Sequence, residues 1–250
     1  ASPAVLWCRK VLSNGKARAI LVNAGIANVF TGKQGKEAVL KIAKQTSEIL
    51  NIKKDEVIIA QTGVIGEPLN ECYIIKCLNT LAKSQKSNGW EKSAQAIMTT
   101  DTFPKYSSLF CEIEGARINI TGFAKGSGMI APNMATMLAF ISTDANVELN
   151  VLNDLIKEVS ELSFNSISVD SDTSTSDTVI LSATGKANNK VISKTSKDSF
   201  MIFRNALVLV CQKLAKQIVR DGEGAKKFIT IKVYGTKTYK QAKSIALSIA

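Results

Sequence analysis

The sequence predicts a mixed α/β fold, a layered sandwich in which buried mixed sheets are covered by helices. Three features indicate it: short apolar runs of strand length, amphipathic helical segments between them, and glycine-containing loops at the strand ends. With 250 residues and a hydrophobic fraction of 45%, the chain can bury a large core in one or two domains. We find no internal repeat and no Pro/Ser/Gly-rich linker, so we expect one unit over residues 1–250.

In the first half of the chain, strands alternate with helices. Residues 19–22 and 57–60 are apolar runs typical of buried strands, and Asn14-Gly15 before them is a hairpin-turn signal. Amphipathic spacing predicts helices that cover residues 36–50, 69–83 and 89–98. Glycine-containing loops, 23–28 and 61–68, follow the two strands. Such loops can present backbone N–H groups to an anion, but a tight turn at Thr62-Gly63 is the simpler alternative.

The second half has a different order of elements. Residues 109–112 and 118–121 form a predicted hairpin around Glu114-Gly115. Further strands are predicted at 135–141, 179–182 and 228–233, and helices at 151–164, 200–220 and 239–250. The run 168–177 is dense in acids and hydroxyls but lacks the glycine and closing glutamate of an EF-hand loop, so we expect a hydrogen-bonded turn there.

The chain contains no histidine, and this restricts its chemistry. Every Ser-His or Cys-His dyad is excluded, so the base in any nucleophilic reaction must be a carboxylate, a lysine or an N-terminal amine. The five cysteines are scattered and include no CxxC pair, which predicts reduced, mostly buried thiols in a cytoplasmic protein. Without histidine or paired cysteines, we expect no metal site.

The formal charge of +11 raises the alternative of a nucleic-acid-binding protein. The lysines are spread along predicted helix faces, and aromatic residues make up only 6% of the chain. A solvated basic surface with a mild attraction for anionic metabolites fits this pattern better. No apolar run has membrane-spanning length, so the sequence predicts partners other than nucleic acid or membrane.

One stretch, residues 125–138, combines a glycine- and proline-containing loop with the start of an apolar strand. Lys125 begins the loop, and Thr136 stands where the strand begins. A threonine hydroxyl becomes a useful nucleophile when a base lies within hydrogen-bond reach. Cleavage of the Ala135–Thr136 bond would supply that base as a new α-amine, with a reference pKa of about 8. From spacing alone, the simpler interpretation is that Thr136 is the first residue of a core strand.

Four motifs settle this question by resemblance. The segment Lys125-Gly-Ser-Gly-Met-Ile-Ala-Pro-Asn-Met-Ala-Thr-Met-Leu138 resembles the self-cleavage segment of the glutamate N-acetyltransferase (ornithine acetyltransferase) family of arginine biosynthesis. The other matches, in the family's order, are Thr62-Gly-Val-Ile-Gly-Glu-Pro-Leu69, Thr99-Thr-Asp-Thr-Phe-Pro-Lys105 and Asp221-Gly-Glu-Gly-Ala225. The resemblance covers essentially the whole chain.

The resemblance implies autocatalytic cleavage between Ala135 and Thr136. Residues 1–135 would belong to an α chain and residues 136–250 to a β chain of a cytoplasmic α2β2 heterotetramer. The fold implied is the layered sandwich of ornithine acetyltransferases and related aminopeptidases. Family members run past Ala250, and the first residues look like the middle of a longer protein, so we expect a fragment lacking both ends.

The resemblance also implies a reaction and a set of site residues. Thr136 would take acetyl from N-acetylornithine and pass it to glutamate, with Thr62 and Gly63 as the oxyanion hole. The substrate-binding positions would be Thr99, Lys125, Thr136 and Glu223. No cofactor is implied, although acetyl-CoA would be a co-substrate if the enzyme also makes N-acetylglutamate directly.

Several positions depart from the family pattern, and Ala24 replaces a serine. Ile26 replaces an asparagine, Ser171 replaces a glycine, and Lys226 replaces a threonine. Two other functions remain open beside acetyl transfer. An N-terminal-threonine amidohydrolase or aminopeptidase would use the same nucleophile and let water attack the acyl-enzyme. An inactive truncated relative would keep the fold without cleavage.

Overall fold

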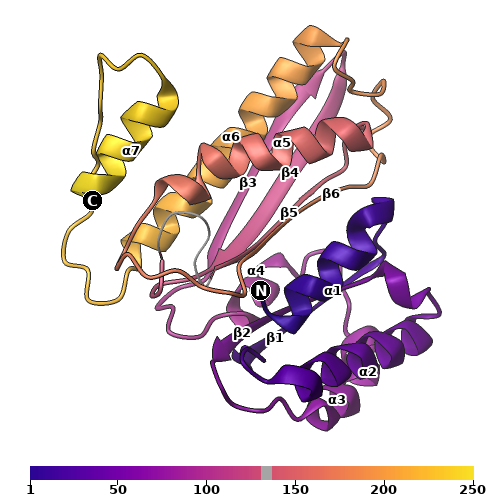
Figure 1. Ribbon diagram of the computed structural model, residues 1–250. Coiled ribbons are helices and arrows are strands. Elements are labelled where there is room, and N and C mark those ends of the chain that lie inside the picture. Colours follow the sequence, from indigo (N-terminus) through magenta and orange to yellow (C-terminus); the bar gives the residue numbers. More distant parts are fainter. Residues whose placement is uncertain (131–136) are drawn as a thin grey trace.

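The computed structural model describes residues 1–130 and 137–250, and it contains two sheets stacked between helices (Figure 1). The smaller sheet pairs β1 (Ala19–Ile26) with β2 (Val57–Val64) in parallel. The larger sheet has the strand order β3-β4-β5-β6. Its strands are β3 (Lys105–Ile113), β4 (Ala116–Lys125), β5 (Leu138–Thr143) and β6 (Thr178–Ala183). The predicted layered sandwich of mixed sheets is confirmed.

Helices of the first half surround the smaller sheet. Of these, α2 (Gly32–Leu50) packs on β2, α1 (Pro3–Val11) packs against both β2 and α2, and α3 (Glu71–Lys83) packs on α2, while α4 (Trp90–Ala96) packs beside β4. The Ser2 hydroxyl caps α1 by accepting from the Val5 N–H. Trp7 on α1 packs into the cluster that α2 and β2 form, and its indole N–H donates to the Val57 carbonyl at 2.9 Å.

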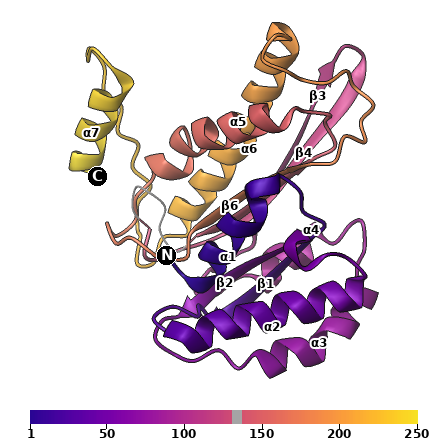
Figure 2. The same cartoon turned by 45° about the vertical axis from the view of Figure 1, so that its right-hand side comes forward.

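Two helices cover the larger sheet on its other side, as Figures 1 and 2 show. They are α5 (Leu149–Glu161), which lies between β5 and β6 in the chain, and the long α6 (Lys197–Arg220), which packs on β3 and β4. Side chains of β5 alternate between the layers: Ile141 packs with the helices, whereas Phe140 faces the space between the sheets. The core of the molecule therefore lies in three apolar layers.

The predicted hairpin is confirmed, and the backbone of its two-residue turn has the left-handed conformation that tight hairpins require. Strands β3 and β4 pair antiparallel, and both turn residues, Glu114 and Gly115, have positive φ values of 50° and 81°.

Short 3-10 helices also occur, at η1 (Leu12–Asn14), η2 (Lys54–Glu56) and η3 (Phe164–Ser166).

Strands β1 and β2 extend further than the sequence predicted. The predicted loop after β1 is strand up to Ile26, and Thr62-Gly63 is strand rather than a tight turn. Parallel pairing explains the extension, because Ala24 pairs with Thr62 and so satisfies backbone groups that a loop would expose. The hairpin prediction at Asn14-Gly15 is wrong, since Gly15 ends η1 and leads into a strand with a parallel neighbour.

The strand predicted at residues 228–233 is not formed. This segment has no strand partner in the described structure, and residues such as Ile229 remain exposed. A strand needs a neighbour to satisfy its backbone groups, and the periodicity of a sequence cannot supply one. The helix that follows, α7 (Tyr239–Ile249), buries none of its residues and lies at the margin of the sandwich in Figure 2, where Tyr239 and Lys243 contact Glu161 at the end of α5.

The prediction of mostly buried cysteines is only partly correct. Cys8 and Cys211 are buried and Cys111 is half-buried, but Cys72 and Cys77 are exposed on α3, which buries only Leu78. All five are free thiols. Within residues 1–130 and 137–250, every helix is too short or too polar to cross a bilayer.

Candidate active site

The ends of the two sheets meet at a lysine and a threonine. Thr62 lies on β2 of the smaller sheet, and Lys125 is the last residue of β4 in the larger one. The Lys125 Nζ donates to the Thr62 Oγ1 at 3.3 Å, and both residues are almost completely buried. Burial lowers the pKa of Lys125, although nearby carboxylates oppose the shift. The contact joins a polar hydroxyl to a cation inside the sandwich.

Gly63 follows Thr62 and lies against the neighbouring strand. Its φ of 128° is a conformation that residues with a side chain rarely adopt. A Cβ at this position would lie 2.2 Å from the carbonyl carbon of Gly25, so the backbones of β1 and β2 could not keep their approach. Glycine is therefore required for the shape of this strand end.

A buried ion cluster lies beside Lys125. Lys105 is completely buried, and its Nζ contacts Asp101 at 2.6 Å and Asp221 at 2.5 Å. The Lys105 ammonium and backbone N–H groups hold the pKa of both carboxyls below the usual value, against the effect of burial. The cluster of Lys105, Asp101 and Asp221 thus keeps its charges compensated.

The two carboxylates of this cluster also bind backbone groups from separate segments. Asp101 accepts the Thr99 N–H at 3.1 Å and the Gly126 N–H at 2.7 Å. Asp221 accepts the Thr102 N–H at 2.9 Å and also the Thr102 hydroxyl. The cluster therefore fixes the loop that carries Thr99, the residue after Lys125, and the start of the loop that carries Glu223.

Glu223 is held against the glycine loop after β4. Its N–H donates to the Ser127 carbonyl at 2.7 Å, and Ser127 also shares a hydroxyl contact with Thr100 at 2.7 Å. A Cβ on Gly128 would lie 2.5 Å from the Glu223 carboxyl carbon, so a side chain at 128 would displace that carboxylate. Glu223 is exposed, yet its charge acts on Lys125 and opposes the fall in pKa.

The acidic run 168–177 binds both sides of the segment 131–136. Asp170 accepts the Ile130 N–H at 2.8 Å and also the Met129 N–H, and Asp177 accepts the Met137 N–H at 2.9 Å. The second carboxylate oxygen of Asp177 is buried and accepts no hydrogen bond from the part of the chain that the structure describes. Burial raises the pKa of Asp177 to about 7, although the Met137 N–H and the Lys125 charge favour ionisation.

The predicted site residues are partly brought together. The Lys125 side chain contacts Thr62, which Gly63 follows in the chain. The charge of Glu223 acts on Lys125. Asp101 binds the backbone N–H groups of both Thr99 and Gly126, and so links Thr99 to the loop that follows Lys125. Ala135 and Thr136 lie outside the described residues.

Sequence reasoning missed four charged residues of this region. Asp101, Lys105 and Asp221 belong to two of the motifs that carry the resemblance, and their charges could have indicated an ion cluster. Asp177 ends the acidic run that was interpreted as a hydrogen-bonded turn. The run does bind backbone N–H groups, but mainly those of another segment.

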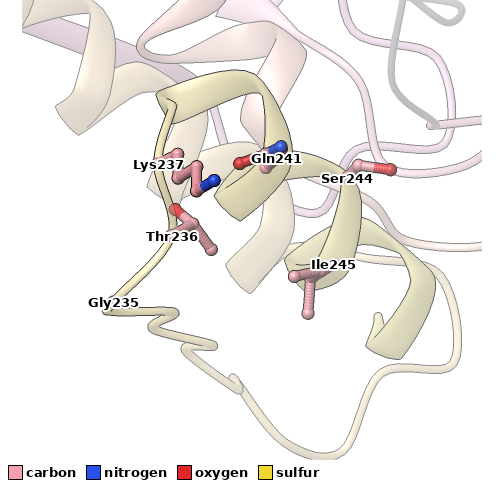
Figure 3. Close-up of a pocket in the computed structure, with 6 residues that line it drawn as sticks. All are labelled: Gly235, Thr236, Lys237, Gln241, Ser244 and Ile245. Atoms are coloured by element: carbon pink, nitrogen blue, oxygen red, sulfur yellow. The ribbon is translucent and has the colours of Figure 1, made fainter.

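Two hollows on the surface lie elsewhere. A shallow one in the C-terminal segment is lined by Lys237 on the loop and by Gln241 and Ile245 on α7 (Figure 3). A larger groove runs between β1, α4 and the larger sheet, with Trp90 and Phe140 among its lining residues. Neither is lined by Thr62, Lys125 or Glu223. No group of acidic and cysteine residues in the described ranges could hold a metal ion.

Fold and site together define a layered α/β protein whose polar site is built where the ends of two sheets meet around a buried lysine. The model of the ArgJ family matches residues 1–250, and the chain belongs to this family.

Similar proteins that carry the ArgJ name support this family membership. The chain is 46% identical over 249 residues to the arginine biosynthesis bifunctional protein ArgJ of Bartonella henselae, covering 100% of this chain and 61% of the relative. Identity to the protein of the same name from Gluconobacter oxydans is 48% over 246 residues, with 98% and 58% covered. The crystal structure of ArgJ from Bacillus halodurans matches with a TM-score of 0.50 at 33% identity, over 54% of this chain and 71% of that one. The chain thus spans about three fifths of the length of these curated relatives.

Proposed function

We propose that the protein carrying this chain is a glutamate N-acetyltransferase that moves acetyl from N-acetylornithine to glutamate through an acetyl-threonine intermediate. The observation that carries the proposal is the buried hydrogen bond from Lys125 to Thr62, which joins two of the family's motifs at one place. Relatives named as bifunctional proteins of arginine biosynthesis support the same pathway. The nucleophile proposed is Thr136, freed by self-cleavage of the Ala135–Thr136 bond.

The proposed reaction has two half-reactions. The Thr136 hydroxyl attacks the acetyl carbonyl of N-acetylornithine, its own α-amine takes the hydroxyl proton, and ornithine leaves with that proton. The amine of glutamate then attacks the ester and leaves as N-acetylglutamate, which returns the hydroxyl. Because one covalent ester links the two steps, we expect ping-pong kinetics.

The residues around Lys125 have complementary roles in this proposal. Thr62 and Gly63 stabilise the oxyanion. Loss of one such hydrogen-bond donor typically raises the activation barrier by about 3 kcal/mol. Lys125 binds a substrate carboxylate, and Glu223 binds a substrate ammonium group. Thr99 completes the binding positions from the loop that Asp101 holds.

Several properties of the whole protein belong to the same proposal. Acetyl-CoA is a second acetyl donor, which would account for the word bifunctional in the names of the relatives. No further cofactor is needed, because a threonine ester carries the acetyl group. After cleavage, the chains that contain residues 1–135 and 136–250 assemble as α2β2 in the cytoplasm.

The deciding experiment compares the full-length wild-type protein with Thr136→Ala. Intact mass should show two chains for the wild type and one for the variant, and only the wild type should form N-acetylglutamate from N-acetylornithine and glutamate. Thr121→Ala, which changes an exposed hydroxyl pair with Ser108, serves as a matched control and should split normally. Acetate release without N-acetylglutamate would favour an amidohydrolase, and a Thr136→Ala variant that still transferred acetyl would refute the assignment.

A further inference from the structure

The carboxylate of Asp101 joins two positions that the proposed function assigns to the substrate. One oxygen accepts the Thr99 N–H at 3.1 Å, and the other accepts the Gly126 N–H at 2.7 Å. Thr99 is a proposed binding position, and Gly126 directly follows Lys125, the proposed partner of a substrate carboxylate. The Asp101 side chain is completely buried, so water does not compete for these hydrogen bonds. A single side chain therefore sets the spacing between the two positions.

We propose that Asp101 is a positioning residue of the substrate site: it fixes the backbone beside Thr99 and Lys125, and its negative charge favours the Lys125 ammonium that binds a substrate carboxylate. This inference rests on the proposed function, since it concerns the residue that recognises the substrate. It gives that recognition an electrostatic origin and a range of pH over which it operates.

The turn at Gly126 brings the backbone to Asp101. Gly126 has a φ of 147°, a conformation that residues with a side chain rarely adopt. A Cβ at this position would also lie 3.1 Å from the Ile130 side chain. The Gly126 N–H donates to Asp101, while Lys125 remains the last residue of β4 and its Nζ reaches the Thr62 hydroxyl. The hydrogen bond thus holds the chain at the point where Lys125 leaves the sheet.

Four charged residues of the described ranges act on Lys125. They come from separate segments: Asp101 and Lys105 before and at the start of β3, Glu223 after α6, and Asp177 before β6. Burial has the largest effect and lowers the pKa of Lys125. Asp101 opposes this shift more than any other charge does, whereas the Lys105 ammonium adds to it. Loss of the Asp101 charge should therefore make the buried ammonium release its proton at lower pH.

The other two carboxylates that act on Lys125 are less suited to this role. Glu223 is exposed, so water and salt screen its charge. Burial raises the pKa of Asp177 to about 7, so it is only partly ionised at neutral pH. Burial also opposes ionisation of Asp101, but the Gly126 N–H and the Lys105 ammonium hold its pKa below the usual value. Of these three carboxylates, Asp101 is the one that is both completely buried and ionised at neutral pH.

Binding of glutarate to the full-length protein tests the inference. Glutarate has two carboxylates and no amine, so its own charge is constant between about pH 7 and 10. Isothermal titration calorimetry measures its affinity at each pH. For the wild type we expect a constant affinity up to a midpoint, and above it a loss of about tenfold per pH unit as Lys125 releases its proton. Lys125→Arg should abolish this decline, because a guanidinium stays charged.

Asp101→Asn removes the charge but keeps the size of the side chain and an acceptor for the Gly126 N–H. We expect its midpoint at lower pH than that of the wild type. Between the two midpoints, the wild type should bind glutarate more tightly, by about tenfold per pH unit of separation.

Asp221→Asn is the matched control. Asp221 contacts the same Lys105 ammonium at 2.5 Å, and its side chain is only 2% exposed. The Gly126 N–H donates to Asp101 and not to Asp221, and Asp221 is not among the described charges that act on Lys125. Both variants should lose stability, but only Asp101→Asn should move the midpoint of glutarate binding.

An unmoved midpoint in folded Asp101→Asn overturns the inference and leaves the proposed function intact. An equal movement in Asp221→Asn also overturns it, since the effect would then belong to the Lys105 ion pairs in general. If Asp101→Asn does not fold, Asp101→Glu decides: it keeps the charge but moves the oxygens, so we expect weaker binding at an unmoved midpoint, and wild-type affinity overturns the inference. A wild type that binds glutarate as expected but transfers no acetyl removes the proposed function and leaves the role of Asp101 standing.

Discussion

The Lys105 Nζ lies 2.6 Å from a carboxylate oxygen of Asp101, and neither side chain is exposed to solvent. The same ammonium contacts Asp221 at 2.5 Å, so one buried cation joins two strongly desolvated anions. Such clusters contribute little net stability compared with apolar packing, but breaking them leaves uncompensated charge. Here the cluster holds the loops that carry Thr99 and Glu223 against the residue after Lys125.

Lys105→Met should destabilise the protein by about 3–5 kcal/mol, because two buried carboxylates would lose their cation. Urea denaturation measures the change in free energy of unfolding. Lys194→Met is the control, since Lys194 contacts Asp154 at the same 2.5 Å but its side chain is 61% exposed. We expect a loss below about 1 kcal/mol there. Equal losses in the two variants would show that the buried cluster has no special role.

Asp177 should make the protein less stable at alkaline pH than at acid pH. Its pKa rises from 3.8 to about 7 on folding, so the folded state binds more protons between these values. The free energy of unfolding therefore falls as pH rises from about 4 to 7. Asp177→Asn should remove this contribution, which increases the free energy of unfolding at pH 8 by on the order of a few kcal/mol and raises the melting temperature relative to the wild type. A variant that melts below the wild type at pH 8 would contradict this.

Asp101 and Asp221 should have the opposite dependence on pH. Their folded-state pKa values lie below the unfolded ones, so their contribution is present above about pH 4 and is lost as pH falls through the folded-state values. Acid titration followed by circular dichroism measures the loss. Lys105→Met should flatten this dependence on acid pH, because burial without the ammonium raises the pKa of both carboxyls, and an unchanged dependence would argue against the ion cluster.

Gly63→Ala should be more damaging than an alanine at another glycine of positive φ. The new Cβ would clash with Gly25 at 2.2 Å in addition to the backbone strain, so we expect more than about 2 kcal/mol of destabilisation and slower acetyl transfer. Gly115→Ala, with φ of 81° and open space around the Cβ, isolates the strain. It should cost about 1–2 kcal/mol and leave transfer intact. Thermal unfolding and an acetyl-transfer assay separate the two effects.

Ser171→Gly should stabilise the protein. Ser171 has a φ of 64° and is exposed, and it stands where the family pattern has glycine. Relief of the left-handed strain, reduced by the greater entropy of glycine when unfolded, predicts a gain of about 0.5–1 kcal/mol. Asn188→Gly is the control at a φ of 57°, and asparagine tolerates this region better, so its gain should be smaller. A loss of stability in Ser171→Gly would contradict the argument.

The local structure of most of the sandwich could be predicted from the sequence. Apolar spacing located α2 and α6, and a glycine after Glu114 located the β3–β4 turn. The motifs pointed to Thr62, Lys125 and Glu223 before any geometry was known. Local patterns succeed for these features because periodicity shows which face of an element is buried.

Non-local pairing decided the rest. Lys125 meets a threonine 63 positions away, and Lys105 meets an aspartate 116 positions away. The predicted strand at 228–233 failed for the same reason, because pairing depends on a neighbour that no local pattern encodes. The sequence by itself determined most of the elements, the absence of histidine and the family's motifs. Only the tertiary structure decided which charges are buried together, since sheet register and desolvation arise when distant segments pack.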